Sequence, residues 1–230
     1  MLKLLGILIL TANCLRFCDA ETLAVQDIPF NGKDLSGWKL KGPAERSKWK
    51  VGKASLDAAD SHKLAFAEGG DELVNTEGKS VDAYTEARWG DCLIEVEVMV
   101  PKGSNSGVYV MGEYEVQVFD SFGKEKVGQG DMGGLYAAAA PKVNASKAPG
   151  EWQKFAIDFR APKFDAEGKR TSPAKFVKVE LNGQVIHADV EMKGPTPGGL
   201  TGKEAATGPI LLQGDHGPVS YRNFKVTPAK

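Results

Sequence analysis

Cysteine is scarce in this chain: three of its 230 residues are cysteines, and two of these, Cys14 and Cys18, lie near the start. If the first twenty residues are removed, Cys92 alone remains. A single cysteine cannot form an intramolecular disulfide, and a zinc cluster built on several thiolates is excluded. Stability must therefore come from a packed core, in which we expect Cys92 to be buried.

An excess of charge of either sign is also missing. The chain has 29 Lys and Arg residues against 30 Asp and Glu residues, a formal net charge of -1, with both signs mixed along its length. A surface that binds nucleic acid or an anionic membrane would show clustered positive charge. We therefore expect no nucleic-acid partner.

The apolar run at the N-terminus, residues 4–10, is too short to span a bilayer. It follows Lys3 and precedes Cys18-Asp19-Ala20, and this order of charged, apolar and small residues is typical of a secretory signal peptide. We predict a signal peptide over residues 1–20, cleaved near Ala20, and a mature protein that is secreted or periplasmic and has no membrane span.

Helix-length amphipathic patterns are nearly absent after residue 20, where short runs rich in Val, Ile, Phe and Tyr alternate with Gly, Pro, Asn and Asp. Residues 93–100 and 114–119 alternate polar and apolar side chains with period two. Glu97 should therefore lie on a polar face of the first run, and Glu115 and Gln117 on a polar face of the second. Both runs are typical of strands with one buried face.

Further strands are predicted over residues 151–159, 175–181, 185–187, 210–213 and 219–226. Asn182-Gly183 is the strongest two-residue hairpin signal in the chain. The Gly- and Pro-rich residues 194–208 favour a long surface loop over a domain boundary. These patterns predict an all-β fold, a two-sheet antiparallel sandwich forming a single domain over residues 21–230.

Short motifs spread in order over this region resemble the 3-keto-disaccharide hydrolase family. They are residues 30–38 (FNGKDLSGW), 90–97 (GDCLIEVE), 105–109 (NSGVY), 114–120 (YEVQVFD), 134–136 (GLY), 150–152 (GEW), 181–183 (LNG), 212–213 (LQ) and 221–224 (YRNF). Cys92 stands where an aromatic residue is commoner, and Gln153 where Asn often follows Trp. The resemblance implies a concanavalin-A-like jelly roll and a carbohydrate substrate, cleaved or hydrated as a 3-keto-glycoside.

A keto group on the third sugar carbon acidifies the proton on the second, so that a base can remove it and the aglycone can leave by β-elimination. Water added afterwards gives net hydrolysis. We hypothesise that Glu115 or His216 is the base and that Arg222 or a bound divalent metal ion stabilises the enolate. Gln117 and Gln213 would then bind sugar hydroxyls.

Three further assignments complete this hypothesis. Glu97 is a candidate substrate-binding residue, and Glu115, Asp120 and His216 are the candidate metal ligands, although no close His/Asp spacing marks a dedicated site. The glycines beside His216 would let the backbone approach a ligand closely. The sequence does not identify the cofactor, if there is one.

Other interpretations of the same residues stay open. The Glu-bearing faces could only solvate a sheet, and Arg222 could pair with a buried carboxylate. A non-catalytic lectin-like module would show a shallow groove with exposed aromatic residues. An ordinary glycosidase would need two carboxylates about 5 Å apart or wider, and Glu95 and Glu97 share one face. The absence of a G-x-S-x-G motif disfavours acyl transfer.

Overall fold

The computed structural model describes residues 26–229, which form strands joined by loops and one short 3-10 helix, η1 (Ala44–Arg46). The strands are β1 (Trp38–Lys41), β2 (Trp49–Leu56), β3 (Leu64–Asn75), β4 (Asp82–Thr85), β5 (Cys92–Met99), β6 (Asn105–Val110), β7 (Tyr114–Phe119), β8 (Gln153–Arg160), β9 (Lys163–Phe164), β10 (Arg170–Ser172), β11 (Lys175–Leu181), β12 (Gln184–Glu191), β13 (Leu211–Leu212) and β14 (Val219–Pro228). The expected signal peptide, residues 1–20, lies outside the described residues.

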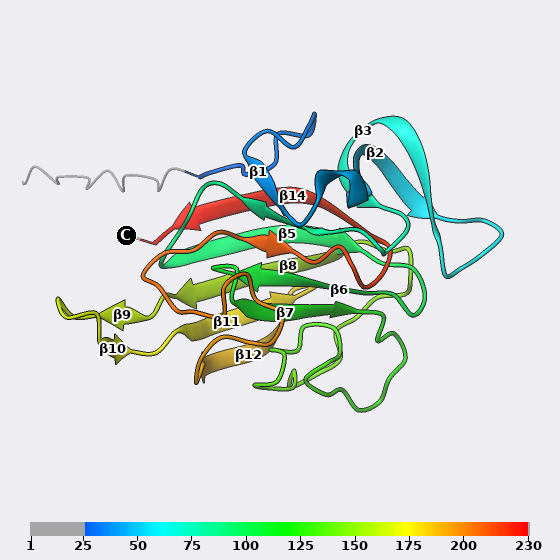
Figure 1. Ribbon diagram of the computed structural model, residues 1–230. Coiled ribbons are helices and arrows are strands. Elements are labelled where there is room, and N and C mark those ends of the chain that lie inside the picture. The colour runs from blue at the N-terminus through cyan, green and yellow to red at the C-terminus, as the bar shows by residue number, and fades with distance from the viewer. Residues whose placement is uncertain (1–25, 230) are drawn as a thin grey trace, which may run out of the picture.

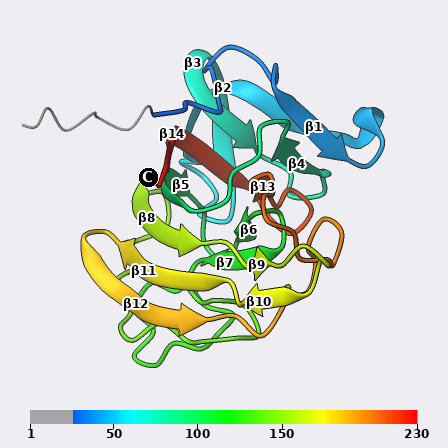
Figure 2. The ribbon, with the colours of Figure 1, turned by 90° about the vertical axis from the view of Figure 1, so that its left-hand side faces the viewer.

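Two large antiparallel sheets form the sandwich (Figures 1 and 2). The seven-stranded sheet has the order β12-β11-β8-β5-β14-β3-β2, and the five-stranded sheet has the order β1-β4-β13-β6-β7. A small two-stranded sheet, β10-β9, lies apart from both. The predicted all-β jelly-roll sandwich is confirmed. Within residues 26–229, no helix has the length and hydropathy of a bilayer-crossing segment.

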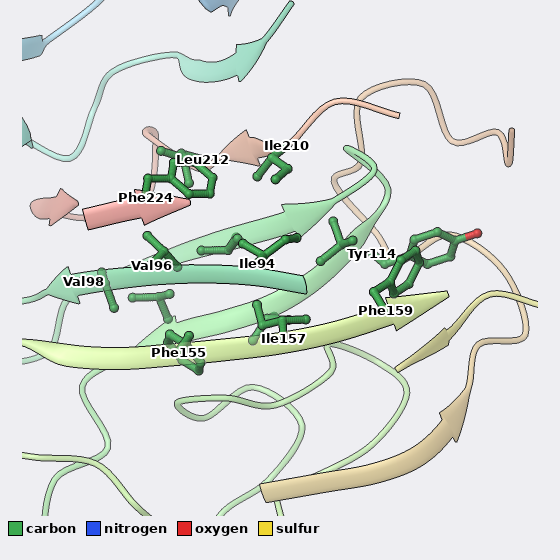
Figure 3. Close-up of a cluster of buried hydrophobic side chains, with 14 of the residues drawn as sticks. Ile94, Val96, Val98, Tyr114, Phe155, Ile157, Phe159, Ile210, Leu212 and Phe224 are labelled. Atoms are coloured by element: carbon green, nitrogen blue, oxygen red, sulfur yellow. The ribbon is translucent and has the colours of Figure 1, made fainter. Parts of the chain in front are cut away.

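The core lies between the two large sheets and follows from the period-two patterns. Along β5, alternate residues such as Ile94, Val96 and Val98 are buried, and Figure 3 shows them beside side chains of β8 such as Phe155 and Ile157. The five-stranded sheet contributes, among others, Val108, Tyr114, Val116, Val118 and Leu212. Each sheet therefore has one apolar face turned inward and one face turned away from the core.

The predicted hairpin is confirmed between β11 and β12, where Leu181 pairs with Gln184. Asn182 and Gly183 have φ values of 53° and 80°, as a type I′ turn requires. Cys92 is buried in the core, as expected, and burial raises the pKa of its thiol to about 12.

Candidate active site

The outward face of the five-stranded sheet is polar where β7, β6 and β13 meet. Val116 pairs with Val108 and faces the core, so the neighbouring Glu115 and Gln117 point away from it. Together with loop residues they line a cavity of about 190 Å³. The lining residues are Asn105, Tyr109, Glu115, Gln117, Tyr136, Pro197, Gly198, Gln213 and His216.

Glu115 is the buried carboxylate of this cavity, with only 3% of its surface exposed. Burial raises the pKa of its carboxyl group from an ordinary 4.5 to about 7, and the charges of Asp82 and Asp215 act in the same direction. A hydrogen bond from Tyr109 and the nearby His216 oppose this rise. A carboxylate that titrates near neutral pH can accept a proton during a reaction and release it afterwards.

Tyr109 lies directly opposite Glu115 in the β6–β7 pairing. Its hydroxyl donates to the carbonyl oxygen of Pro197 at 3.3 Å, and it lies near enough to the Glu115 carboxyl to lower the pKa of that group. Because the hydroxyl has one proton, it can donate to only one of these acceptors at a time. Burial and the Glu115 charge raise the pKa of Tyr109, so the hydroxyl stays protonated as a donor.

Gly107 makes room for the Glu115 side chain. A Cβ atom placed on Gly107 would overlap Oε1 of Glu115, so the carboxylate lies over the bare Cα of the neighbouring strand. The glycine is therefore required for close approach, and any larger residue would push the carboxylate aside.

Two amides complete the floor of the cavity. Gln117 donates from Nε2 to Asn105 Oδ1 at 3.0 Å, which fixes the orientation of its amide. Gln213 is held by its backbone N–H, which donates to Gly107 O at 2.9 Å, and its Nε2 is 3.4 Å from the Tyr109 hydroxyl. Oε1 of Gln213 is buried and has no hydrogen-bond partner among residues 26–229. Since an unpaired buried acceptor is costly, this oxygen is suited to accept a ligand hydroxyl.

The walls of the cavity are attached to the backbone of Glu115 itself. β7 is an edge strand, and its free N–H and C=O groups bind two loops. Glu115 N donates to Thr196 Oγ1 at 3.0 Å, and Tyr136 N donates to Glu115 O at 3.2 Å. Thr196 also donates from N and Oγ1 to Glu113 O. Both loops are thus held in a fixed position relative to the Glu115 carboxylate.

The wall that carries Tyr136 contains a strained residue. Ala137 has φ of 55°, a left-handed conformation that costs a non-glycine residue about 1 kcal/mol or more. Leu135 N donates to Ala139 O, and Ala138 N and Ala139 N both donate to Leu135 O, so the turn holds Ala137 in this conformation. Tyr136 is thereby presented beside the cavity with 37% of its surface exposed.

The open side of the cavity carries charged side chains. His216 Nδ1 contacts Asp215 Oδ1, and both side chains are half exposed. Asp82 accepts from Gly214 N at 3.0 Å and lies 3.5 Å from Lys41 Nζ, which donates to Gly198 O at 2.8 Å. The loop residues Gly198 and Gly214 are therefore linked, through Lys41 and Asp82, to strands β1 and β4.

The sequence-based hypothesis placed Glu97 and Arg222 in the same hollow, and this placement is wrong. Glu97 pairs with Arg222 in the β5–β14 register, and both point away from the core on the seven-stranded sheet, across the sandwich from Glu115. Arg222 Nε donates to Glu97 Oε2 at 2.8 Å, and its guanidinium lies 4.0 Å from the centroid of Trp152. They form an ion pair rather than part of the cavity.

Asp120 also lies outside the cavity lining. Its Oδ2 accepts from Gly103 N at 2.9 Å, so it orders the turn before β6. Across the described range, 26–229, no three His, Cys, Asp or Glu side chains are grouped so that they could hold a metal ion. Glu115, Asp120 and His216 are therefore not brought together as a metal-binding set.

Sequence reasoning did not select Tyr109, Tyr136 or Asn105 as site residues. A signal for two of them was present, because Asn105, Gly107 and Tyr109 alternate on one face of a run that precedes the Glu115 strand. Tyr136 lies in a turn whose approach to β7 depends on tertiary hydrogen bonds, which no local pattern encodes.

The fold and site define a jelly-roll protein with a polar cavity on the outward face of one sheet. Residues 28–227 match the family described as 3-keto-alpha-glucoside-1,2-lyase-like domain, and the chain belongs to this family. The resemblance seen in the sequence motifs is confirmed.

Solved structures show the same fold. One, described as a candidate glycosyl hydrolase from Parabacteroides distasonis ATCC 8503, is 28% identical to this chain, with a TM-score of 0.69 over 89% of this chain and 84% of that one. A second from the same organism and with the same description is 17% identical, with a TM-score of 0.62 over 89% and 94%. No curated protein matches the chain at a significant level.

Proposed function

We propose that this protein is a carbohydrate-active enzyme that cleaves 3-keto-glycosides by β-elimination, with Glu115 as the base. The observation that carries the proposal is the buried Glu115 carboxylate, whose pKa is raised to about 7 and which lies among hydrogen-bonding side chains in a cavity of about 190 Å³. Membership of the 3-keto-alpha-glucoside-1,2-lyase-like family supports the substrate class. The cavity is smaller than typical ligand pockets of about 300–1,000 Å³, which favours occupation by one sugar ring rather than by a whole disaccharide.

In the proposed reaction, Glu115 removes the proton from C2 of the keto-sugar. The electron pair of the C2–H bond forms the enolate, whose charge lies on the oxygen at C3. Collapse of the enolate forms the C1=C2 double bond and breaks the bond from C1 to the aglycone oxygen, which takes up a proton. Addition of water across C1=C2 then gives net hydrolysis.

The other residues of the cavity fit defined tasks in this scheme. The protonated Tyr109 hydroxyl and the Gln213 Nε2 amide are donors for the enolate oxygen, a task that the sequence-based hypothesis gave to Arg222 or a bound divalent metal ion. Loss of one such donor typically costs about 100-fold or more in kcat. Gln117 and Gln213 Oε1 would bind ring hydroxyls, and His216 at the exposed side would protonate the departing oxygen.

Export through the leader of residues 1–20 is part of the same proposal. It rests on the charged, apolar and small-residue order at the N-terminus. Comparing the N-terminal residue of the protein recovered from the medium or periplasm with Glu21 tests it.

The test measures release of 4-nitrophenol from both anomers of 4-nitrophenyl 3-keto-glucoside, and incorporation of deuterium at C2 in D₂O by NMR. Glu115→Gln should lower kcat at least about 100-fold, because general-base catalysis contributes about 10²–10⁴-fold. Glu97→Gln, a matched change on the opposite sheet, should keep kcat/KM within about twofold. Full turnover by Glu115→Gln would remove Glu115 as the base, and binding of both anomers by the wild type without cleavage would favour a lectin-like module.

A further inference from the structure

A second cavity, of about 180 Å³, adjoins the first and shares Tyr136 and Pro197 with it. Its lining combines apolar side chains with exposed polar ones at the edge. The residues that matter here are Tyr136, Ala138, Met192, Gly194, Pro195 and Pro197, with Glu191 and Lys193 at the edge.

The two walls of this second cavity are anchored on the same residue that supplies the proposed base. Tyr136 N donates to Glu115 O, and Glu115 N donates to Thr196 Oγ1, at 3.2 and 3.0 Å. Thr196 lies between Pro195 and Pro197 in the lining. A ligand that extends from the first cavity into the second would therefore meet walls fixed relative to Glu115, with little ordering required on binding.

The exposed ring of Tyr136 stands at the boundary between the two cavities. Large aromatic side chains that remain accessible while their backbone is held rigidly are suited to stack against a flat ring of a ligand. The left-handed Ala137 next to it belongs to the hydrogen-bonded turn that fixes the backbone of Tyr136. Pro195 and Pro197, which line the same cavity, offer a second apolar surface.

From this geometry we propose that the second cavity is the aglycone subsite and that it selects glycosides whose aglycone carries a ring with an apolar face, either a second sugar ring or an aryl group. The inference rests on the proposed function, because it assumes that the reacting sugar occupies the cavity of Glu115. A leaving group bound between Tyr136 and the prolines would have its C1–O bond next to that cavity.

Gly194 offers a way to block the subsite without overlap with the rest of the protein. A Cβ atom on Gly194 meets no other heavy atom within 4 Å, and its φ is not in the left-handed region. Gly194 lines the second cavity but not the first. Gly194→Val should therefore add bulk at the lining of the second cavity while the fold is preserved, and Tyr136→Ala should remove the stacking surface.

The experiment compares kcat/KM for methyl 3-keto-glucoside, phenyl 3-keto-glucoside and a 3-keto-disaccharide. In Gly194→Val and Tyr136→Ala, the ratio of ring-bearing to methyl glycoside should fall about tenfold, a size typical of one lost aromatic contact. Ala58→Val, which adds two carbon atoms rather than three at an exposed position in the β2–β3 turn, should leave the ratio unchanged. A loss confined to the disaccharide identifies a sugar as the aglycone, and an equal loss for the phenyl glycoside identifies any flat ring.

An unchanged ratio in both Tyr136→Ala and Gly194→Val, or an equal loss for the methyl glycoside, would overturn the subsite. Dissociation constants for the same three glycosides are measured by calorimetry beside turnover. If the wild type cleaves none of them, the proposed function fails, but a ring preference in Kd that Gly194→Val abolishes would still support the subsite, and its absence would still refute it.

Discussion

Compared with the wild type, the Glu115→Gln variant should be more stable at alkaline pH than at acidic pH. The pKa of Glu115 in the folded state is raised from 4.5 to about 7, mainly by burial, since only 3% of the surface of this residue is exposed to solvent. At one pKa unit per 1.36 kcal/mol, ionising this group costs the folded state about 3 kcal/mol. The favourable contribution of the neutral form is complete below pH 4.5 and is lost as the pH rises through 7.

Gln cannot ionise, so the difference in unfolding free energy between Glu115→Gln and the wild type should grow by about 2.5 kcal/mol between pH 5 and pH 8. Urea denaturation followed by tryptophan fluorescence at both pH values measures this difference, and any constant cost of the amide cancels. In Glu97→Gln the difference should hardly change over this range. Although partial burial acts to raise it, the pKa of Glu97 is lowered by its hydrogen bond from Arg222. A pH-independent difference for Glu115→Gln would refute the reasoning.

Three further outcomes are expected. The rate of aglycone release should rise with pH through an apparent pKa of about 7, since the base must be ionised, and a profile flat from pH 5 to 8 would count against Glu115. Gly107→Ala should lower kcat at least tenfold with little change in Tm, because the added Cβ displaces the Glu115 carboxylate and not the backbone. A large loss of Tm with normal kcat per folded molecule would contradict this. Gly183→Ala should lower the unfolding free energy by about 1 kcal/mol, as φ of 80° strains a residue with a Cβ, and urea denaturation measures it.

Which residues of a strand lie on the same face could be predicted from the sequence, because side chains alternate with period two. Glu115 and Gln117 were assigned to the face opposite Tyr114 and Val116, and the structure agrees. The hairpin at Asn182-Gly183 could be predicted for an equally local reason, since only certain residues adopt positive φ readily.

Which sheet each strand joins could not be predicted in this way. Alternation tells which residues of a strand share a face, but each of the two sheets has a face turned away from the core. The pairing of β14 with β5 brings together segments more than a hundred residues apart. Arg222 therefore lies beside Glu97 and not beside Glu115. Tyr136 depends on a loop hydrogen bond to β7, which has no counterpart in the local sequence.

The outer edge of β7 is one of the sheet edges at which this architecture could be open to a second molecule. An unprotected edge strand offers its amides and carbonyls to any extended chain and can nucleate aggregation. Glu115 N is already bound to Thr196, and Gln117 N and O are bound to Gly134 O and Gly133 N. The loops that line the two cavities thus also keep this strand from recruiting partners, and a change that loosened them should lower solubility together with the proposed aglycone selectivity.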